Sequence, residues 1–311
     1  MPAPERIPAR GSVNRAEHEG PAPDAAPVPA APASPAGEPA ADAVAALLAH
    51  GELSVTGRIA DASNGVFYGT VTADGACVAC VYKPVAGERP LWDFPTGTLA
   101  GREVAAYEVC RALGWDLVPP TVLRDGPFGE GMCQQWVGPA PDADEPAPTA
   151  ADELLALVDA DEPGPGWKAV GFAETGPGRT ALLVHADDAR LRRLAVLDAV
   201  INNADRKGGH LLPLPDGRLR AIDHGVAFHT DDKLRTLLWG WAGEPLPQSV
   251  REPLRRLAGE LAPGGALTGR LAGLLSEVEL EALRKRVAGL LGGGRHPLPG
   301  GNWPAIPWPP V

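Results

Sequence analysis

Two aspartates, Asp205 and Asp223, stand at the ends of a predicted polar loop and short hairpin, and Lys207 and His210 lie between them. Transfer of a phosphoryl group from ATP needs one carboxylate to orient the accepting hydroxyl. It also needs a second carboxylate, with a neighbouring ligand, to hold Mg²⁺ on the nucleotide. We therefore expect Asp205 to be catalytic, with Lys207 meeting the charge that develops on the γ-phosphate. We expect Asp223 and His210 to bind the metal.

A less specific interpretation is open for the first aspartate. Asn202 and Asn203 stand just before Asp205, and such residues at the end of a helix commonly serve only to cap it and form a turn. The second aspartate, Asp223, argues against that interpretation. It follows the apolar residues Ala221 and Ile222 and gives the chain two acids, Asp205 and Asp223, at the two ends of the same segment. Asp198 interrupts the apolar stripe that leads into this region, and we expect it to support the loop by hydrogen bonding.

Lys83 and Glu103 are the candidate residues on the nucleotide side. Lys83 follows the strand-like run Val78–Tyr82, where an ammonium group could neutralise the α- and β-phosphates, and the chain has few other lysines. Glu103 shares a helix face with apolar residues, and a buried acid needs a cationic partner. We expect that partner to be Lys83. The alternatives are a solvated lysine at a strand end and a loosely packed amphipathic helix.

A loop of small residues lies between the first two predicted strands. Ser63, Asn64 and Gly65 could let backbone N–H groups approach phosphates. Any polar hairpin turn has a similar composition, so this loop alone indicates little.

Composition excludes several classes of function. The net charge is -11 and the pI is about 5.1, whereas nucleic acids and anionic membranes select basic surfaces. No run of 18 apolar residues is present, and the N-terminus has no apolar signal region, so we expect no transmembrane segment and a cytoplasmic location. The four cysteines lack a second metal-ligand pair and are expected to be reduced thiols.

The first half of the chain predicts a tail and a small lobe. Residues 1–41 are rich in Pro and Ala with almost no large apolar side chains, so we expect disorder. Residues 42–138 alternate strand-like runs and turn signals around one long helical pattern, which indicates a β-rich, nucleotide-binding lobe. The expected elements are helices at 42–50 and 99–113 and strands at 53–59, 65–72, 77–82, 120–123 and 131–137.

The second half predicts a larger, mostly helical lobe at 139–294, beginning with a linker at 139–148. A helix capped by Asp187 or Asp188 leads into Asp205, and a hairpin follows at 211–214 and 219–222. Ser276 and Glu279 form a capping box for a last helix. Residues 295–311 form a Pro/Trp-rich tail expected to lie extended over the surface. A β-rich lobe followed by a helical lobe predicts an α+β, bilobal, protein-kinase-like fold.

At these residues the chain resembles the phosphatidylinositol 3-/4-kinase superfamily, and most of all its type II phosphatidylinositol 4-kinase branch. The resemblance implies that Lys83 binds ATP phosphates, Asp205 is catalytic, Asp223 is a metal ligand, and adenine bonds the backbone near Trp136 and Val137. The matching pieces, in chain order, are Ser63-Asn-Gly-Val-Phe-Tyr, Ala79-Cys-Val-Tyr-Lys-Pro, Gly131-Met-Cys-Gln-Gln-Trp-Val, Val196-Leu-Asp-Ala-Val-Ile-Asn-Asn-Ala-Asp-Arg, Ala221-Ile-Asp-His-Gly-Val-Ala-Phe and Trp239-Gly-Trp.

The chain also departs from that family. His210 stands where the family offers Asn to the metal, and imidazole is a poor Mg²⁺ ligand that suits Mn²⁺ better. The cysteine cluster that lipid-anchors eukaryotic members of the family is missing, and so is a basic patch. We therefore do not assign the family's phosphoinositide substrate to this chain. We therefore expect a kinase that uses ATP and Mg²⁺ or Mn²⁺ on a hydroxyl of a lipid headgroup, small molecule or protein. A nucleotide-binding pseudokinase and an AMPylase are the alternative hypotheses.

Overall fold

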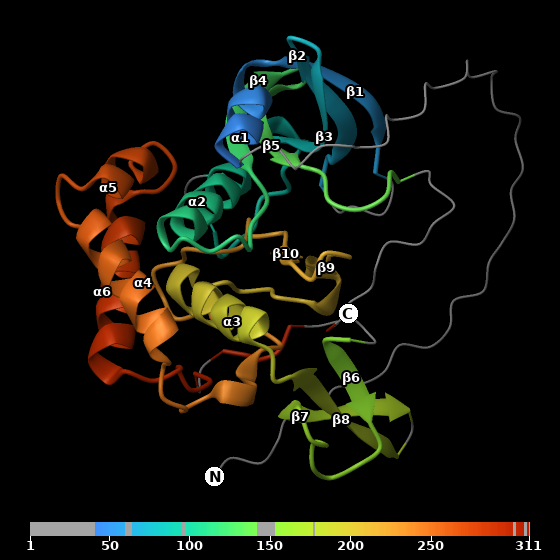
Figure 1. Ribbon diagram of the computed structural model, residues 1–311, viewed down its shortest axis with the longest axis vertical. Helices are drawn as coiled ribbons and strands as arrows, with labels where there is room; N and C mark the ends of the chain where they lie inside the picture. Colours follow the sequence, from blue (N-terminus) through green and yellow to red (C-terminus); the bar gives the residue numbers. More distant parts are fainter. Residues whose placement is uncertain are drawn as a thin grey trace, which may run out of the picture.

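The computed structural model describes residues 41–59, 64–94, 98–141, 153–176, 178–300, 303–307 and 310. These residues form a β-rich lobe, a helical lobe and a small separate sheet (Figure 1). The predicted tail at 1–41, apart from Ala41, lies outside the described residues, as do Ser63 and most of the predicted linker. No helix within the described ranges is both long and apolar enough to cross a bilayer.

The β-rich lobe is built on a five-stranded antiparallel sheet in the order β1-β2-β3-β5-β4. Its helix α1 covers one face of the sheet and α2 covers the other. The bounds are α1 Ala41–His50, β1 Glu52–Arg58, β2 Phe67–Ala73, β3 Ala76–Pro84, a 3₁₀ turn η1 Val85–Gly87, α2 Leu99–Ala112, β4 Thr121–Gly126 and β5 Gly129–Gln135.

The central strand β3 shows how the sheet aims its side chains. Cys80 packs in the cluster under α1, whereas its neighbour Val81 packs in the cluster under α2. Successive strand residues point to opposite faces, so Lys83, two positions beyond Val81, lies on the α2 side. The strand pattern thereby directs the only lysine of this lobe toward the helix that carries Glu103.

Helix α2 packs against both lobes. Thr98 caps its N-terminus by accepting a hydrogen bond from the Gly101 N–H (2.9 Å). One side of α2 packs on the β-sheet and another side joins the large core of the helical lobe. Arg102 also forms a buried ion pair with Glu279 of the last helix (2.6 Å), so α2 is anchored in both lobes.

In the described part of the helical lobe, four helices and a short hairpin surround one apolar core. The last helix begins with the predicted capping box of Ser276 and Glu279 and ends at Gly294, whose φ of 61° is left-handed. The bounds are α3 Ala189–Ile201, η2 Gly208–His210, β9 Leu211–Pro213, β10 Leu219–Ala221, η3 Trp239–Trp241, α4 Gln248–Glu260, α5 Ala266–Leu271 and α6 Glu277–Gly293.

A three-stranded sheet, which the sequence patterns did not predict, precedes α3. Its strands are β6 Leu155–Val158, β7 Trp167–Gly176 and β8 Arg179–Ala186, in the order β6-β8-β7. In Figure 1 this sheet lies on the side of α3 opposite the β-rich lobe. Gly240 of η3 fixes it to the helical lobe, because its N–H donates to His185 Nε2 (3.0 Å).

Candidate active site

Lys83 contacts two carboxylates, one from each lobe. Its Nζ lies 2.9 Å from Glu103 Oε1 and also contacts Asp223 Oδ1, and Asp223 belongs to the loop after β10. Burial alone would lower the pKa of Lys83, but the charges of Asp223 and Glu103 raise it well above its ordinary value. Attraction to Lys83 in turn lowers the pKa of Asp223. At neutral pH Lys83 and Asp223 are therefore ionised. The expected pair of Lys83 with Glu103 is present.

Glu103 also fixes the loop that carries Asp223. Its second oxygen, Oε2, accepts a hydrogen bond from the His224 N–H (2.8 Å), and its side chain is only 4% exposed. Gly225 packs closely on the start of α2, because a Cβ there would lie 3.2 Å from Leu99 Cβ. A single helix residue thus positions both the lysine and the aspartate of the opposite lobe.

Asp205 lies in the turn that leaves α3. The helix ends at Asn202, whose φ of 55° is left-handed, and Asn203 Oδ1 accepts a hydrogen bond from the Asp205 N–H (3.0 Å). The Asp205 carboxylate lies between two cations, 3.3 Å from Lys207 Nζ and 3.5 Å from an Arg235 nitrogen. Burial raises the pKa of Asp205 although both cations oppose that shift. The carboxyl is partly exposed and can still meet a ligand.

Arg206 ties the two loops together beneath the site. Its guanidinium pairs with Asp198 (3.0 Å), donates to the Ile222 carbonyl (2.9 Å) and contacts His224 Nε2 (2.7 Å). Both Arg206 and Asp198 are fully buried. Asp198 therefore supports the loop of Asp205 as predicted, and it does so through an arginine whose role was not predicted. This pair sets the spacing between the loops of Asp205 and Asp223.

His210 and Asp223 are the predicted metal ligands. His210 Nε2 lies 3.6 Å from Asp223 Oδ2, and burial lowers the pKa of His210 to about 4, which leaves its imidazole neutral at pH 7. In the part of the chain that the structure describes, no three or more His, Cys, Asp or Glu side chains gather in a metal-holding cluster. A magnesium site on a nucleotide commonly has one or two protein ligands, with phosphate oxygens and waters completing it. The two side chains fit such a site.

The loop of Asn64 and Gly65 folds onto η1. Asn64 Oδ1 accepts from the Arg89 N–H (3.0 Å), and the Gly65 N–H donates to the Gly87 carbonyl (3.0 Å). Of the three residues predicted to cover phosphates, Ser63 lies outside the described residues. The Gly65 N–H is already used within the protein, so phosphate contact by this loop would require that bond to be exchanged.

The segment after β5 connects the lobes where adenine was expected to bind. Trp136 N–H donates to the Ala79 carbonyl (2.9 Å), and its indole Nε1 donates to the Pro139 carbonyl (2.8 Å). The indole also meets the edge of Tyr68 from β2, with ring centroids 5.1 Å apart. Trp136 and Val137 are each partly exposed at this connection.

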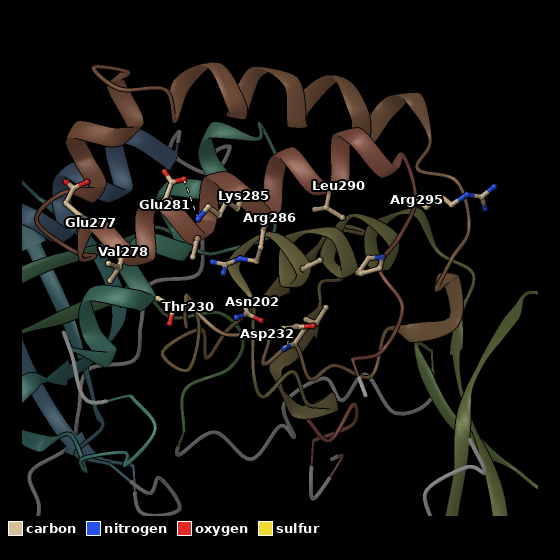
Figure 2. A pocket seen from close by; sticks show the side chains of 15 residues that line it. Asn202, Thr230, Asp232, Glu277, Val278, Glu281, Lys285, Arg286, Leu290 and Arg295 are labelled. Atoms are coloured by element: carbon tan, nitrogen blue, oxygen red, sulfur yellow. Dashed lines mark hydrogen bonds and ion pairs between the residues drawn. The ribbon is translucent and has the colours of Figure 1, made fainter. Parts of the chain in front are cut away.

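A cavity of about 780 Å³ lies elsewhere, between α6 and the C-terminal end of α3 (Figure 2). Lys285 and Arg286 from α6 and Asn202 from the end of α3 line it. Arg286 donates to the carbonyls of Val200 and His229 and thus holds α6 against α3. None of the site residues predicted from the sequence is among the described residues of its lining. The convergence of Lys83, Glu103 and Asp223, not this cavity, is therefore the candidate active site.

Arg235 is a second site residue that the sequence did not reveal. It stands 12 positions beyond Asp223 in no recognisable pattern, yet its Nε donates to the Ala204 carbonyl (2.6 Å) and its guanidinium faces Asp205. Only the fold of the intervening loop brings it there.

Comparison with known structures agrees with the two-lobed arrangement. A crystal structure of the Golgi casein kinase with Mn/ADP bound matches with a TM-score of 0.52 at 15% identity, over 81% of this chain and 75% of that chain. A further crystal structure of the Golgi casein kinase gives a TM-score of 0.50 at 15% identity, over 81% and 74%. At this identity the likeness shows the fold alone. The predicted α+β, bilobal, kinase-like fold is confirmed.

Sequence comparison gives a much nearer relative. No protein-family model matches the chain. Protein Rv2133c of Mycobacterium tuberculosis is 50% identical over 264 residues, which span 85% of this chain and 94% of that protein. The chain has a bilobal kinase-like fold and belongs to the family of protein Rv2133c.

Proposed function

We propose that the protein is an ATP-dependent phosphotransferase that moves the γ-phosphate of ATP to a hydroxyl group. The observation that carries this proposal is the contact of Lys83 with both Glu103 and Asp223, which come from different lobes. An ionised lysine held by a buried glutamate and facing an aspartate is the arrangement that kinases use to hold ATP phosphates and a metal ion. The kinase fold of the Mn/ADP-bound Golgi casein kinase supports the use of a nucleotide and a divalent metal.

Each side chain has a defined part in this proposal. Lys83 exchanges its contact with Asp223 for the α- and β-phosphates, while Glu103 keeps it in place. Asp205 accepts the proton of the attacking hydroxyl as the new oxygen–phosphorus bond forms and the bond to the β–γ bridging oxygen breaks, releasing ADP. Lys207 offsets the charge on the transferred group. Asp223 and His210 would hold Mg²⁺ or Mn²⁺, which supplies neutralisation of the phosphate charge when bound.

The motif resemblance further supports membership of the phosphatidylinositol 3-/4-kinase superfamily, near its type II branch. In this proposal residues 42–138 supply the nucleotide side and residues 139–294 supply the catalytic and metal side. Adenine bonds the backbone beside Trp136 and Val137. His210 is an imidazole in place of an amide ligand, and it favours Mn²⁺. The same replacement is the observation that favours the second candidate function, a pseudokinase that binds nucleotide without turnover.

Incubation with ATP labelled at the γ- or the α-phosphate, with Mg²⁺ or Mn²⁺, tests the function directly. We expect label to move from the γ position, and Asp223→Asn to lower that transfer by about a hundredfold or more. Lys285→Gln, an exposed change on α6, is the control and should transfer normally. Transfer from the α position would indicate an AMPylase instead. Nucleotide binding without transfer from either position would indicate a pseudokinase.

A further inference from the structure

Near the C-terminus, two described parts of the segment 303–310 contact two segments that follow Asp205 in the sequence, and we call 303–310 the strap. Its described residues are Trp303–Pro307 and Pro310. The Ala305 carbonyl accepts hydrogen bonds from the Thr236 N–H (3.0 Å) and from Trp239 Nε1 (2.8 Å). The Pro310 carbonyl accepts from the Gly208 N–H (2.8 Å). The strap is therefore held by backbone carbonyls that pair with N–H donors of the helical lobe.

These contacts adjoin the two cations that face Asp205. Gly208 follows Lys207, the first cation beside the Asp205 carboxylate. The ring of Trp303 lies 5.7 Å from the guanidinium of Arg235, the second of those cations. The strap thus contacts the segments that carry both cations beside Asp205, the group proposed to receive the proton of the accepting hydroxyl.

Trp303 is the main side-chain anchor of the strap. Its ring centroid is 4.0 Å from Lys233 Nζ, and Lys233 also pairs with Asp93 of the β-rich lobe (2.9 Å). Lys233 is only 7% exposed, so this cation–π contact is largely shielded from water. Farther along the strap, Pro307 is buried and Ile306 packs against the core of the helical lobe.

The strap has no side chain that a kinase could phosphorylate. Trp-Pro-Ala-Ile-Pro-Trp-Pro-Pro contains no Ser, Thr or Tyr and no charged group, so it has no side-chain hydroxyl to phosphorylate. Its prolines favour an extended backbone. Recognition of an extended chain through its carbonyls is independent of most side chains and would serve another polypeptide equally well.

We propose that the strap occupies a track for an extended polypeptide acceptor and restrains phosphoryl transfer until such an acceptor displaces it. The inference rests on the phosphotransferase function proposed above. In that reaction a serine or threonine hydroxyl of the displacing chain attacks the γ-phosphorus, its proton passes to Asp205, and ADP leaves.

The test compares Trp303→Ala in the full-length protein with two matched variants. Trp303→Phe keeps an aromatic ring over Lys233. Trp92→Ala removes another ring near Lys233 (5.4 Å) that is outside the strap and 86% exposed. The probe is a fluorescein-labelled degenerate peptide library with a central serine or threonine. Peptide binding is measured by anisotropy, transfer by γ-label, and folding of each variant by thermal unfolding.

We expect Trp303→Ala to bind and phosphorylate the library about threefold to thirtyfold better than wild type, which is the span of a shielded cation–π contact. Trp303→Phe and Trp92→Ala should behave like wild type. A free peptide of residues 301–311 should suppress the gain of Trp303→Ala. Hydrogen exchange at the Gly208 and Thr236 amides should become faster in that variant alone.

Three results would overturn the inference. One is a folded Trp303→Ala variant that binds peptide no better than wild type. This binding result overturns the inference whether or not any variant transfers phosphate. A second is label transfer to phosphatidylinositol vesicles and not to peptides, because the acceptor would then be a lipid. A third is equal stimulation by Trp92→Ala. Peptide binding that responds to Trp303→Ala without any γ-label transfer would instead remove the proposed phosphotransferase function.

Discussion

Replacing Asp198 by Asn removes the negative partner of a fully buried arginine. The Asp198 carboxylate accepts hydrogen bonds from Arg206 (3.0–3.2 Å), from Asn203 Nδ2 (3.0 Å) and from Thr236 Oγ1 (3.1 Å). An amide retains one acceptor but no charge, so the guanidinium is left uncompensated away from water. Breaking a buried pair in this way destabilises a protein by about 3–5 kcal/mol. We expect Asp198→Asn to lose about 3 kcal/mol or more of its free energy of unfolding.

Urea unfolding followed by far-ultraviolet circular dichroism measures this loss, with the denaturant slope expected to stay unchanged. Lys285→Gln is the control, because Lys285 is 75% exposed and its pair with Glu281 spans 3.9 Å. It should stay within about 0.5 kcal/mol of wild type. The double variant Asp198→Leu, Arg206→Met should be more stable than Asp198→Asn, since it leaves no buried charge. A loss below about 1 kcal/mol for Asp198→Asn would refute the reasoning.

Two further predictions concern the attachment of the three-stranded sheet. Burial lowers the pKa of His185 to about 4, so between pH 6.5 and 4 the unfolded chain binds a proton that the folded protein excludes. The free energy of unfolding should therefore fall as the pH decreases through this window, and His185 accounts for up to about 3 kcal/mol of that fall. Urea unfolding at pH 7.5 and at pH 5 measures the difference, which should be smaller in His185→Gln than in wild type. Gly240→Ala places a Cβ 2.3 Å from Lys168 Cβ and 2.5 Å from His185 Nε2, so hydrogen exchange in β7 should become faster. Gly289→Ala is the control, because an added Cβ in α6 meets nothing within 4 Å, and it should stabilise the protein by about 1 kcal/mol. Equal rates of hydrogen exchange in β7 for Gly240→Ala and Gly289→Ala would contradict the predicted clash.

Local patterns were sufficient to predict one of the two acids that Lys83 meets, Glu103, whereas the contact of Lys83 with Asp223 was not predicted. Lys83 was identified by its place at the end of a strand, and a lone acid on an apolar helix face identified Glu103 as its partner. The aspartates Asp205 and Asp223 were visible because each follows an apolar run at the edge of a polar loop. Helix caps predicted the starts of α3 and α6 to within a residue or two.

Contacts between distant segments could not be predicted in the same way. Arg235 reaches Asp205 only because the loop after β10 folds back, and no spacing in the sequence records that path. The sheet of β6–β8 was missed because its pairing depends on a turn at Gly178, whose φ of 70° is left-handed, and on packing against η3. The strap was expected to lie on the surface, and its hydrogen bonds to Gly208 and Thr236 follow from packing, not from composition.

Calorimetric titration of a non-hydrolysable ATP analogue, with Mn²⁺ and then with a chelator, tests the central claim most directly. If Lys83, Glu103 and Asp223 form one nucleotide–metal site, wild-type protein should bind the analogue about tenfold or more tightly with metal. Asp223→Asn should remain folded and lose that metal dependence. An Asp223→Asn variant that keeps the full dependence on Mn²⁺, or wild-type binding that is indifferent to metal, would contradict the account.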